Sequence, residues 1–132
     1  MQEKRVIPTD LLAARDLAEE LLGKVQSQGY EEAELFAIRL ALEEGLINAI
    51  KHGNKFDRDK SITVRMELDA RHVVICIADE GDGFDPAAVP DPTADENLEK
   101  PCGRGIMLMR AYMDKVEFND RGNEVRMVKN RS

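Results

Sequence analysis

Glu44, Asn48 and His52 lie four residues apart, which places a carboxylate, an amide and an imidazole along one line of a predicted helix. The amide oxygen of Asn48 suits a hard cation such as Mg²⁺, which takes few protein ligands beside water and phosphate oxygens. The Glu44 carboxylate, one turn earlier, can polarise a water or a hydroxyl nucleophile. A solvent-facing polar stripe has the same spacing, so this line of residues leaves both interpretations open.

A second signal, the segment DEGDG at 79–83, directly follows an apolar run. A carboxylate at the end of an interior strand, here Asp79, is a fixed acceptor suited to the exocyclic amino group of adenine. The glycines allow positive φ angles and close approach of a ligand. An ordinary turn explains the segment equally well. A calcium loop of the EF-hand type is disfavoured, because its twelfth position needs Glu and here is Pro90.

The third signal is Gly103-Arg104-Gly105, which opens a short apolar helix predicted from 104 to about 113. Free amides at a helix N-terminus, exposed by glycines, form an anion site, so phosphates are expected there. The segment lacks the GxxxxGK[ST] pattern of a P-loop. It is also no dinucleotide fingerprint, because no strand-glycine-helix unit leads into it.

The order of these signals resembles the N, G1 and G2 boxes of the GHKL ATPase superfamily: ALEEGLINAIKHGN on a helix, ADEGDGFDP after a strand, and GRGIMLMRAYMD after a long loop. Within that superfamily, NAIKHGN, MDKVEF and GNEVRMVKN resemble segments of the anti-sigma-factor serine/threonine kinases. The similarity covers nearly the whole chain.

The resemblance implies that ATP and Mg²⁺ bind at these motifs. It makes Asn48 the Mg²⁺ ligand and Glu44 the base or water-orienting carboxylate. His52 matches the family's HG pair but receives no chemical task. The other motif residues are implied to contact adenine (Asp79, Gly81 and Gly83) or the phosphates (Gly103, Arg104 and Gly105).

Residues 80–103 hold four of the five prolines and no usable period, which predicts one long loop. Long loops in small domains are commonly functional or mobile, and the resemblance makes residues 84–103 an ATP lid. Two features depart from the family. The lid is rich in proline, and Gly122-Asn123-Glu124 stands where many members have Gly-Thr, so a hydroxyl contact near adenine is not expected.

Two amphipathic helices are predicted near the N-terminus. The first has Thr9 or Asp10 as its cap, apolar residues at three-to-four spacing over 11–25, and an end near Gly29. The second, over 31–53, begins with an acidic run that suits the positive end of the helix dipole.

Alternating residues predict strands at 62–68 and 116–127, the latter a hairpin about an Arg121-Gly122 turn. The apolar run 72–78 predicts a central strand buried on both faces, and residues 3–9 a short edge strand limited by Pro8. This pattern predicts a two-layer α/β sandwich, with a mixed, mostly antiparallel sheet and helices on one face. The resemblance identifies it as the Bergerat fold.

A chain of 132 residues suits a single domain, here 1–132. The net charge of −7 argues against a nucleic-acid partner, which would need a basic surface. No segment resembles a membrane span, and the first residues lack the apolar region of a secretory signal, so a cytoplasmic protein is expected. Cys76 and Cys102 show no metal-ligand spacing and are interpreted as free thiols.

The resemblance implies an anti-sigma factor that transfers the γ-phosphoryl group of ATP to Ser or Thr of an antagonist protein, holds a sigma factor inactive, and forms a homodimer. One alternative is a regulatory module of the same fold that binds nucleotide without catalysis, but such a module needs neither Glu44 nor Asn48. Another is a detached sensor histidine-kinase domain. It would require a phospho-accepting His on a dimerisation helix, and His52 and His72 lie elsewhere.

Overall fold

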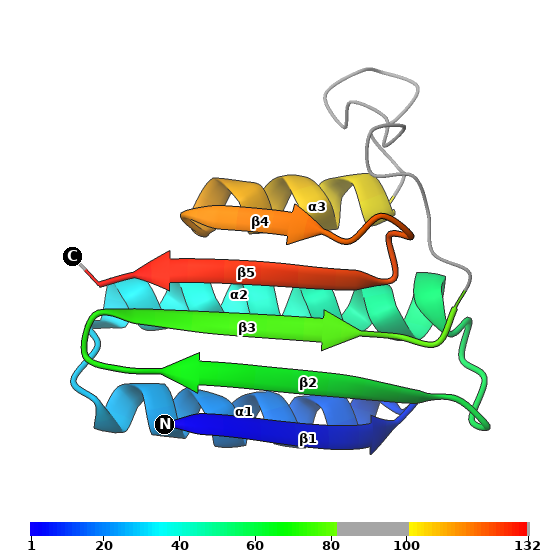
Figure 1. The fold of residues 1–132 in the computed structure, drawn as a ribbon, viewed down its shortest axis with the longest axis horizontal. Coiled ribbons are helices and arrows are strands. Elements are labelled where there is room, and N and C mark those ends of the chain that lie inside the picture. Colours follow the sequence, from blue (N-terminus) through cyan, green and yellow to red (C-terminus); the bar gives the residue numbers. More distant parts are fainter. Residues whose placement is uncertain (82–100, 132) are drawn as a thin grey trace.

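A five-stranded sheet covered on one face by helices makes up the part of the chain that the computed structural model describes, residues 1–81 and 101–131 without the side chains of 101–104 (Figure 1). No helix within these residues is long and apolar enough to cross a membrane. The elements in chain order are β1 (Gln2–Pro8), α1 (Leu11–Ser27), α2 (Glu32–Asn48), the π-helical turn η1 (Ala49–Gly53), β2 (Ser61–Leu68), β3 (His72–Ala78), α3 (Pro101–Tyr112), β4 (Lys115–Phe118) and β5 (Glu124–Asn130).

The strand order is β1-β2-β3-β5-β4, and each of the four neighbouring pairs is antiparallel. The predicted two-layer α/β sandwich is therefore confirmed, and its sheet is antiparallel rather than mixed. β1 is an edge strand, as predicted, and ends at Pro8, which has no backbone N–H to continue the ladder.

Side chains at the helix starts explain where the two long helices begin. Asp10 caps α1, because its Oδ1 accepts a hydrogen bond of 2.9 Å from the backbone N of Leu12. α2 begins with a capping box, in which the backbone N of Glu31 donates to Glu34 at 2.9 Å. At its other end α2 passes into η1, a π-helical turn that periodicity alone does not predict.

The core lies between the sheet and the helices. α2 comes very close to β3, since a β-carbon on Gly45 would lie 2.7 Å from the Cδ1 of Ile77. The large side chains that are almost completely buried come from both layers: Leu21, Val25, Ile38, Leu42, Ile50, Ile62, Val64, Met66, Ile75, Ile77, Met109 and Met127.

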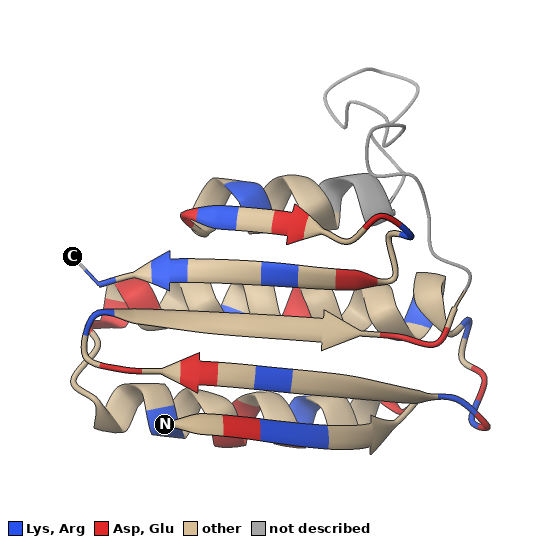
Figure 2. Ribbon diagram, in the orientation of Figure 1, with Lys and Arg blue, Asp and Glu red and all other residues tan. Residues whose placement is uncertain are grey.

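The other face of the sheet carries no helix, and β1, β2, β4 and β5 carry charged residues (Figure 2). On β3, Cys76 and Ala78 point to this open face and are only half-buried. The prediction that the central strand is buried on both faces is therefore wrong for these two residues, because helices pack on one side only. Cys76 is a free cysteine, as expected.

α3 starts at Pro101, three residues before the predicted helix. The last part of the range predicted as an ATP lid, 101–103, thus belongs to this helix. Residues 84–100 of the predicted lid lie outside the described residues, as does the side chain of Cys102.

Candidate nucleotide site

The three sequence signals meet at one end of the molecule. Here α2 and η1 end, β3 ends and α3 begins, at the right of the view in Figure 1. The antiparallel sheet carries β3 toward this end, and α2 runs along its back in the same direction. The packing therefore brings together segments that are separated by tens of residues in the chain.

Glu44 and Asn48 lie against Gly105 in the first half of α3. A β-carbon built on Gly105 would lie 3.0 Å from Oε2 of Glu44 and 3.1 Å from Nδ2 of Asn48. Both side chains are half-buried rather than fully exposed. The polar stripe is thus turned toward α3, and the solvent-facing interpretation of these two residues does not hold.

His52 does not join this pair. It lies in η1 and is exposed, whereas Glu44 and Asn48 are half-buried. The side chains nearest to Gly105 within the described residues are those of Glu44 and Asn48.

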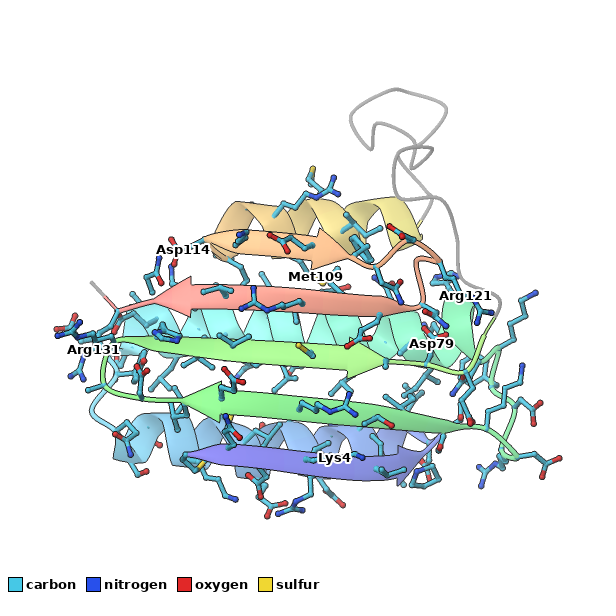
Figure 3. The ribbon with its side chains drawn as sticks, in the orientation of Figure 1. Lys4, Asp79, Met109, Asp114, Arg121 and Arg131 are labelled. Atoms are coloured by element: carbon cyan, nitrogen blue, oxygen red, sulfur yellow. The ribbon has the colours of Figure 1, made fainter. Side chains whose placement is uncertain are left out.

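Asp79 follows β3 directly and lies beside the turn between β4 and β5 (Figure 3). Its Oδ1 accepts a hydrogen bond of 2.8 Å from the backbone N of Gly81. Within the described residues, Oδ2 accepts no hydrogen bond. Burial raises the pKa of the Asp79 carboxyl above its ordinary value of 3.8, although the hydrogen bond from Gly81 and the charge of Lys60 oppose that shift. The site therefore holds a half-buried carboxylate whose Oδ2 can accept a hydrogen bond from a ligand.

Gly53 and Gly81 allow the end of α2 to approach Asp79. A β-carbon on Gly53 would lie 2.2 Å from Oδ2 of Asp79, and one on Gly81 would lie 2.1 Å from the carbonyl oxygen of Gly53. Any larger residue at either place would force the two segments apart. Sequence reasoning identified Gly81 but not Gly53, because a glycine at the end of a helix also suits an ordinary helix stop.

Asn54 is a second residue that sequence reasoning missed. Its side chain is 1% exposed and accepts a hydrogen bond of 2.8 Å from the backbone N of Glu80, the neighbour of Asp79. The backbone N of Asp79 donates a hydrogen bond of 2.9 Å to the carbonyl oxygen of Asn123. The turn in which this chain departs from the family therefore contacts Asp79 through its backbone.

The remaining candidates are placed only in part. Gly103 and Arg104 belong to the first turn of α3, and their side chains lie outside the described residues. Gly83 lies wholly outside them. The structure thus brings together Glu44 with Asn48 and Gly105, and Asp79 with Gly81.

Comparison with known proteins shows the family of this chain. Residues 7–129 match the family described as histidine kinase-like ATPase domain. The chain is 30% identical over 118 residues to the serine-protein kinase RsbW of Bacillus subtilis, covering 83% of this chain and 72% of that protein. It is 30% identical over 99 residues to the anti-sigma F factor of Clostridium beijerinckii, covering 72% and 68%.

A solved structure shows the same fold. The RsbU and RsbW domains of a Mycobacterium tuberculosis protein align with a TM-score of 0.67 at 16% identity. The alignment covers 99% of this chain and 32% of that one, so this chain spans about a third of its length. The chain therefore belongs to the histidine kinase-like ATPase domains, and among them to the anti-sigma-factor serine/threonine kinase family.

Proposed function

We propose that this chain is an ATP- and Mg²⁺-dependent anti-sigma factor with serine/threonine protein kinase activity. It phosphorylates an anti-sigma-factor antagonist, sequesters a sigma factor, forms a homodimer and works in the cytoplasm. The printed names of its relatives, serine-protein kinase and anti-sigma F factor, support the two halves of this proposal. The observation that carries it is the half-buried carboxylate of Asp79 at the end of β3.

Asp79 is suited to adenine. The backbone N of Gly81 donates to its Oδ1, and its Oδ2 has no hydrogen-bond partner within the described residues. The 6-amino group of adenine is a donor and satisfies such an acceptor, whereas guanine presents a carbonyl oxygen at the same place. Partial burial strengthens this choice, because an unpaired charge is costly away from water.

Asn48 and the start of α3 are suited to the phosphate end. Asn48 would hold Mg²⁺, which when bound offsets the negative charge on the phosphate oxygens. The residues proposed to contact the phosphates, Gly103, Arg104 and Gly105, belong to the first half of α3, whose N-terminal amides favour anions. Gly105 lies next to Asn48, so the proposed metal ligand and phosphate contacts are adjacent.

Glu44 is the proposed base. In the transfer, the hydroxyl oxygen of the antagonist's Ser or Thr bonds to the γ-phosphorus, the bond from that phosphorus to the β,γ-bridging oxygen breaks, and ADP leaves. Glu44 accepts the hydroxyl proton, and Arg104 offsets charge on the transferred group. A β-carbon on Gly105 would lie 3.0 Å from Oε2 of Glu44, which supports a place for this carboxylate beside the proposed phosphate contacts.

The test begins with capture of partners. The purified chain, loaded with ATP or with ADP, is used to capture proteins from cytoplasm of the source cells. The captured proteins are then incubated with γ-labelled ATP, Mg²⁺ and either the parent chain or Glu44→Gln. We expect acid-stable phosphoserine or phosphothreonine on a captured protein with the parent and at least a hundredfold less, to an order of magnitude, with Glu44→Gln.

Glu43→Gln is the matched control, since Glu43 is the exposed neighbour of Glu44 and its carboxylate lies 3.8 Å from Arg39. This variant should transfer phosphate like the parent. ATP binding without any acid-stable transfer would reduce the proposal to a nucleotide-binding regulator, and acid-labile phosphohistidine would contradict it. Sedimentation of the parent tests the homodimer separately.

A further inference from the structure

Asn54 is a buried polar side chain with every hydrogen-bonding group in use. It follows η1 and is 1% exposed. Its Nδ2 donates to Thr9 Oγ1 and to the carbonyl oxygen of Ser61, both at 3.0 Å, and its Oδ1 accepts from the backbone N of Glu80 at 2.8 Å. Because an unpaired buried amide is costly, these three partners hold the side chain in one orientation.

The partners belong to different parts of the fold. Thr9, itself 2% exposed, precedes α1 and donates through Oγ1 to the carbonyl oxygen of Lys60 at 2.7 Å. Ser61 begins β2, and Glu80 follows β3. Asn54 therefore joins the end of the helix that carries Glu44 and Asn48 to the turn that carries Asp79.

The contact with Glu80 completes the support of that turn. Three consecutive backbone N–H groups each have a separate acceptor: Asp79 donates to the carbonyl oxygen of Asn123, Glu80 to Oδ1 of Asn54, and Gly81 to Oδ1 of Asp79. Among these acceptors, only Oδ1 of Asn54 belongs to a side chain from outside the turn. Asn54, which is buried, thus contributes to holding the turn that carries Asp79.

We infer that Asn54 is a positioning residue for base recognition: by fixing the N–H of Glu80, it aims Oδ2 of Asp79 and sets the preference for adenine over guanine. This inference rests on the proposed nucleotide site. Loss of the Glu80 contact frees the turn to rotate, and Asp79 then no longer discriminates the amino group of adenine from the carbonyl group of guanine.

A purely structural role predicts something different. If Asn54 only stabilises the fold, then loss of its hydrogen bond to Thr9 should lower stability and change nucleotide binding in the same way as loss of the Asn54 side chain itself. Thr9→Val removes the hydroxyl at nearly constant volume and keeps Asn54 next to Glu80, so it is the matched control. Asn54→Asp keeps the Oδ1 acceptor for Glu80 but loses both donors, and serves as the conservative variant.

The experiment measures affinity by calorimetry for non-hydrolysable ATP and GTP analogues with Mg²⁺, and for tripolyphosphate, which has no base. We expect the parent to prefer the ATP analogue by about tenfold or more. Asn54→Ala should lose most of this ratio while its affinity for tripolyphosphate stays within about twofold of the parent. Thr9→Val and Asn54→Asp should keep the ratio despite lower melting temperatures.

Each other outcome has a distinct meaning. An unchanged ratio in Asn54→Ala, or an equal loss of the ratio in all three variants, overturns the positioning role. A parent that shows no preference for ATP overturns the proposed role of Asp79 instead. If Asn54→Ala does not fold, Asn54→Ser takes its place, because the shorter hydroxyl side chain cannot span the distance to Glu80, and the same results decide.

Discussion

The Oδ2 atom of Asp79 lies 2.2 Å from the point where Gly53 would carry a β-carbon. The end of α2 and the turn after β3 are therefore in contact at the carboxylate that we propose for adenine. This contact is available only to glycine, and it makes the geometry of Asp79 sensitive to residues on another element.

Gly53→Ala is expected to displace the Asp79 carboxylate and weaken binding of an ATP analogue by about tenfold or more. Gly53 does not have a positive φ, so alanine can adopt its backbone conformation. The expected loss of affinity therefore comes from the clash of the new β-carbon with Asp79. Calorimetric titration measures the affinity.

Gly23→Ala is the control for this substitution, because a β-carbon there meets nothing within 4 Å on the exposed side of α1. It should leave ATP binding unchanged and stabilise the helix by about 0.5 to 1 kcal/mol. If Gly53→Ala binds the analogue as tightly as Gly23→Ala does, the position of Asp79 is not what controls affinity.

Asn48→Ala should reduce the affinity for the ATP analogue in Mg²⁺ by about tenfold or more, and by much less when Mg²⁺ is replaced with EDTA. The reason is that only the proposed cation contact is removed. Gln26→Ala, which removes an exposed amide from α1, should match the parent in both conditions. An equal loss of affinity with and without Mg²⁺ would rule out a metal role for Asn48.

Asp79→Asn should change how stability depends on pH. Burial raises the pKa of Asp79 in the folded chain above its ordinary value of 3.8. A raised pKa means that the folded state holds the proton more tightly than the unfolded state does. The stability contributed by this group is therefore full below the unfolded pKa and is lost as pH rises through the folded pKa.

Asparagine carries no such charge, yet its Oδ1 can still accept from Gly81. The free energy of unfolding of Asp79→Asn minus that of the parent should accordingly grow as the pH rises from about 4 to about 8. Urea unfolding curves across that range measure the difference. A difference that shrinks toward neutral pH would show that the hydrogen bond from Gly81 lowers the pKa of Asp79 by more than burial raises it.

Asp10→Ala should lower the free energy of unfolding by about 1 kcal/mol, because the N-terminal amides of α1 lose their cap. Oδ1 of Asp10 accepts from the backbone N of Leu12 at 2.9 Å. Asp16→Ala, at an exposed position within the same helix, is the comparison. ATP affinity should stay unchanged in both variants, and equal stability of the two would mean that Asp10 does not cap the helix.

The sequence by itself determined the elements and the order of the motifs. Spacing of three to four over 11–25 places Leu17, Leu21 and Val25 on one helical face, and the structure buries all three. Alternation places Ile62 and Val64 in the core, and Pro8 ends the edge strand for lack of an N–H. These features follow from local geometry, which repeats along the chain and needs no distant partner.

Tertiary structure alone decided which motif residues meet. Glu44 and Asn48 could face solvent or a ligand with the same spacing, and only the packing of α3 turned them toward Gly105. His52, in the π-helical turn, stayed exposed. Asn54 became buried between β2 and the turn after β3, where its side chain holds the backbone next to Asp79. Such contacts join residues far apart in the chain, so they depend on how close two elements can pack, and no local pattern in the sequence encodes that distance.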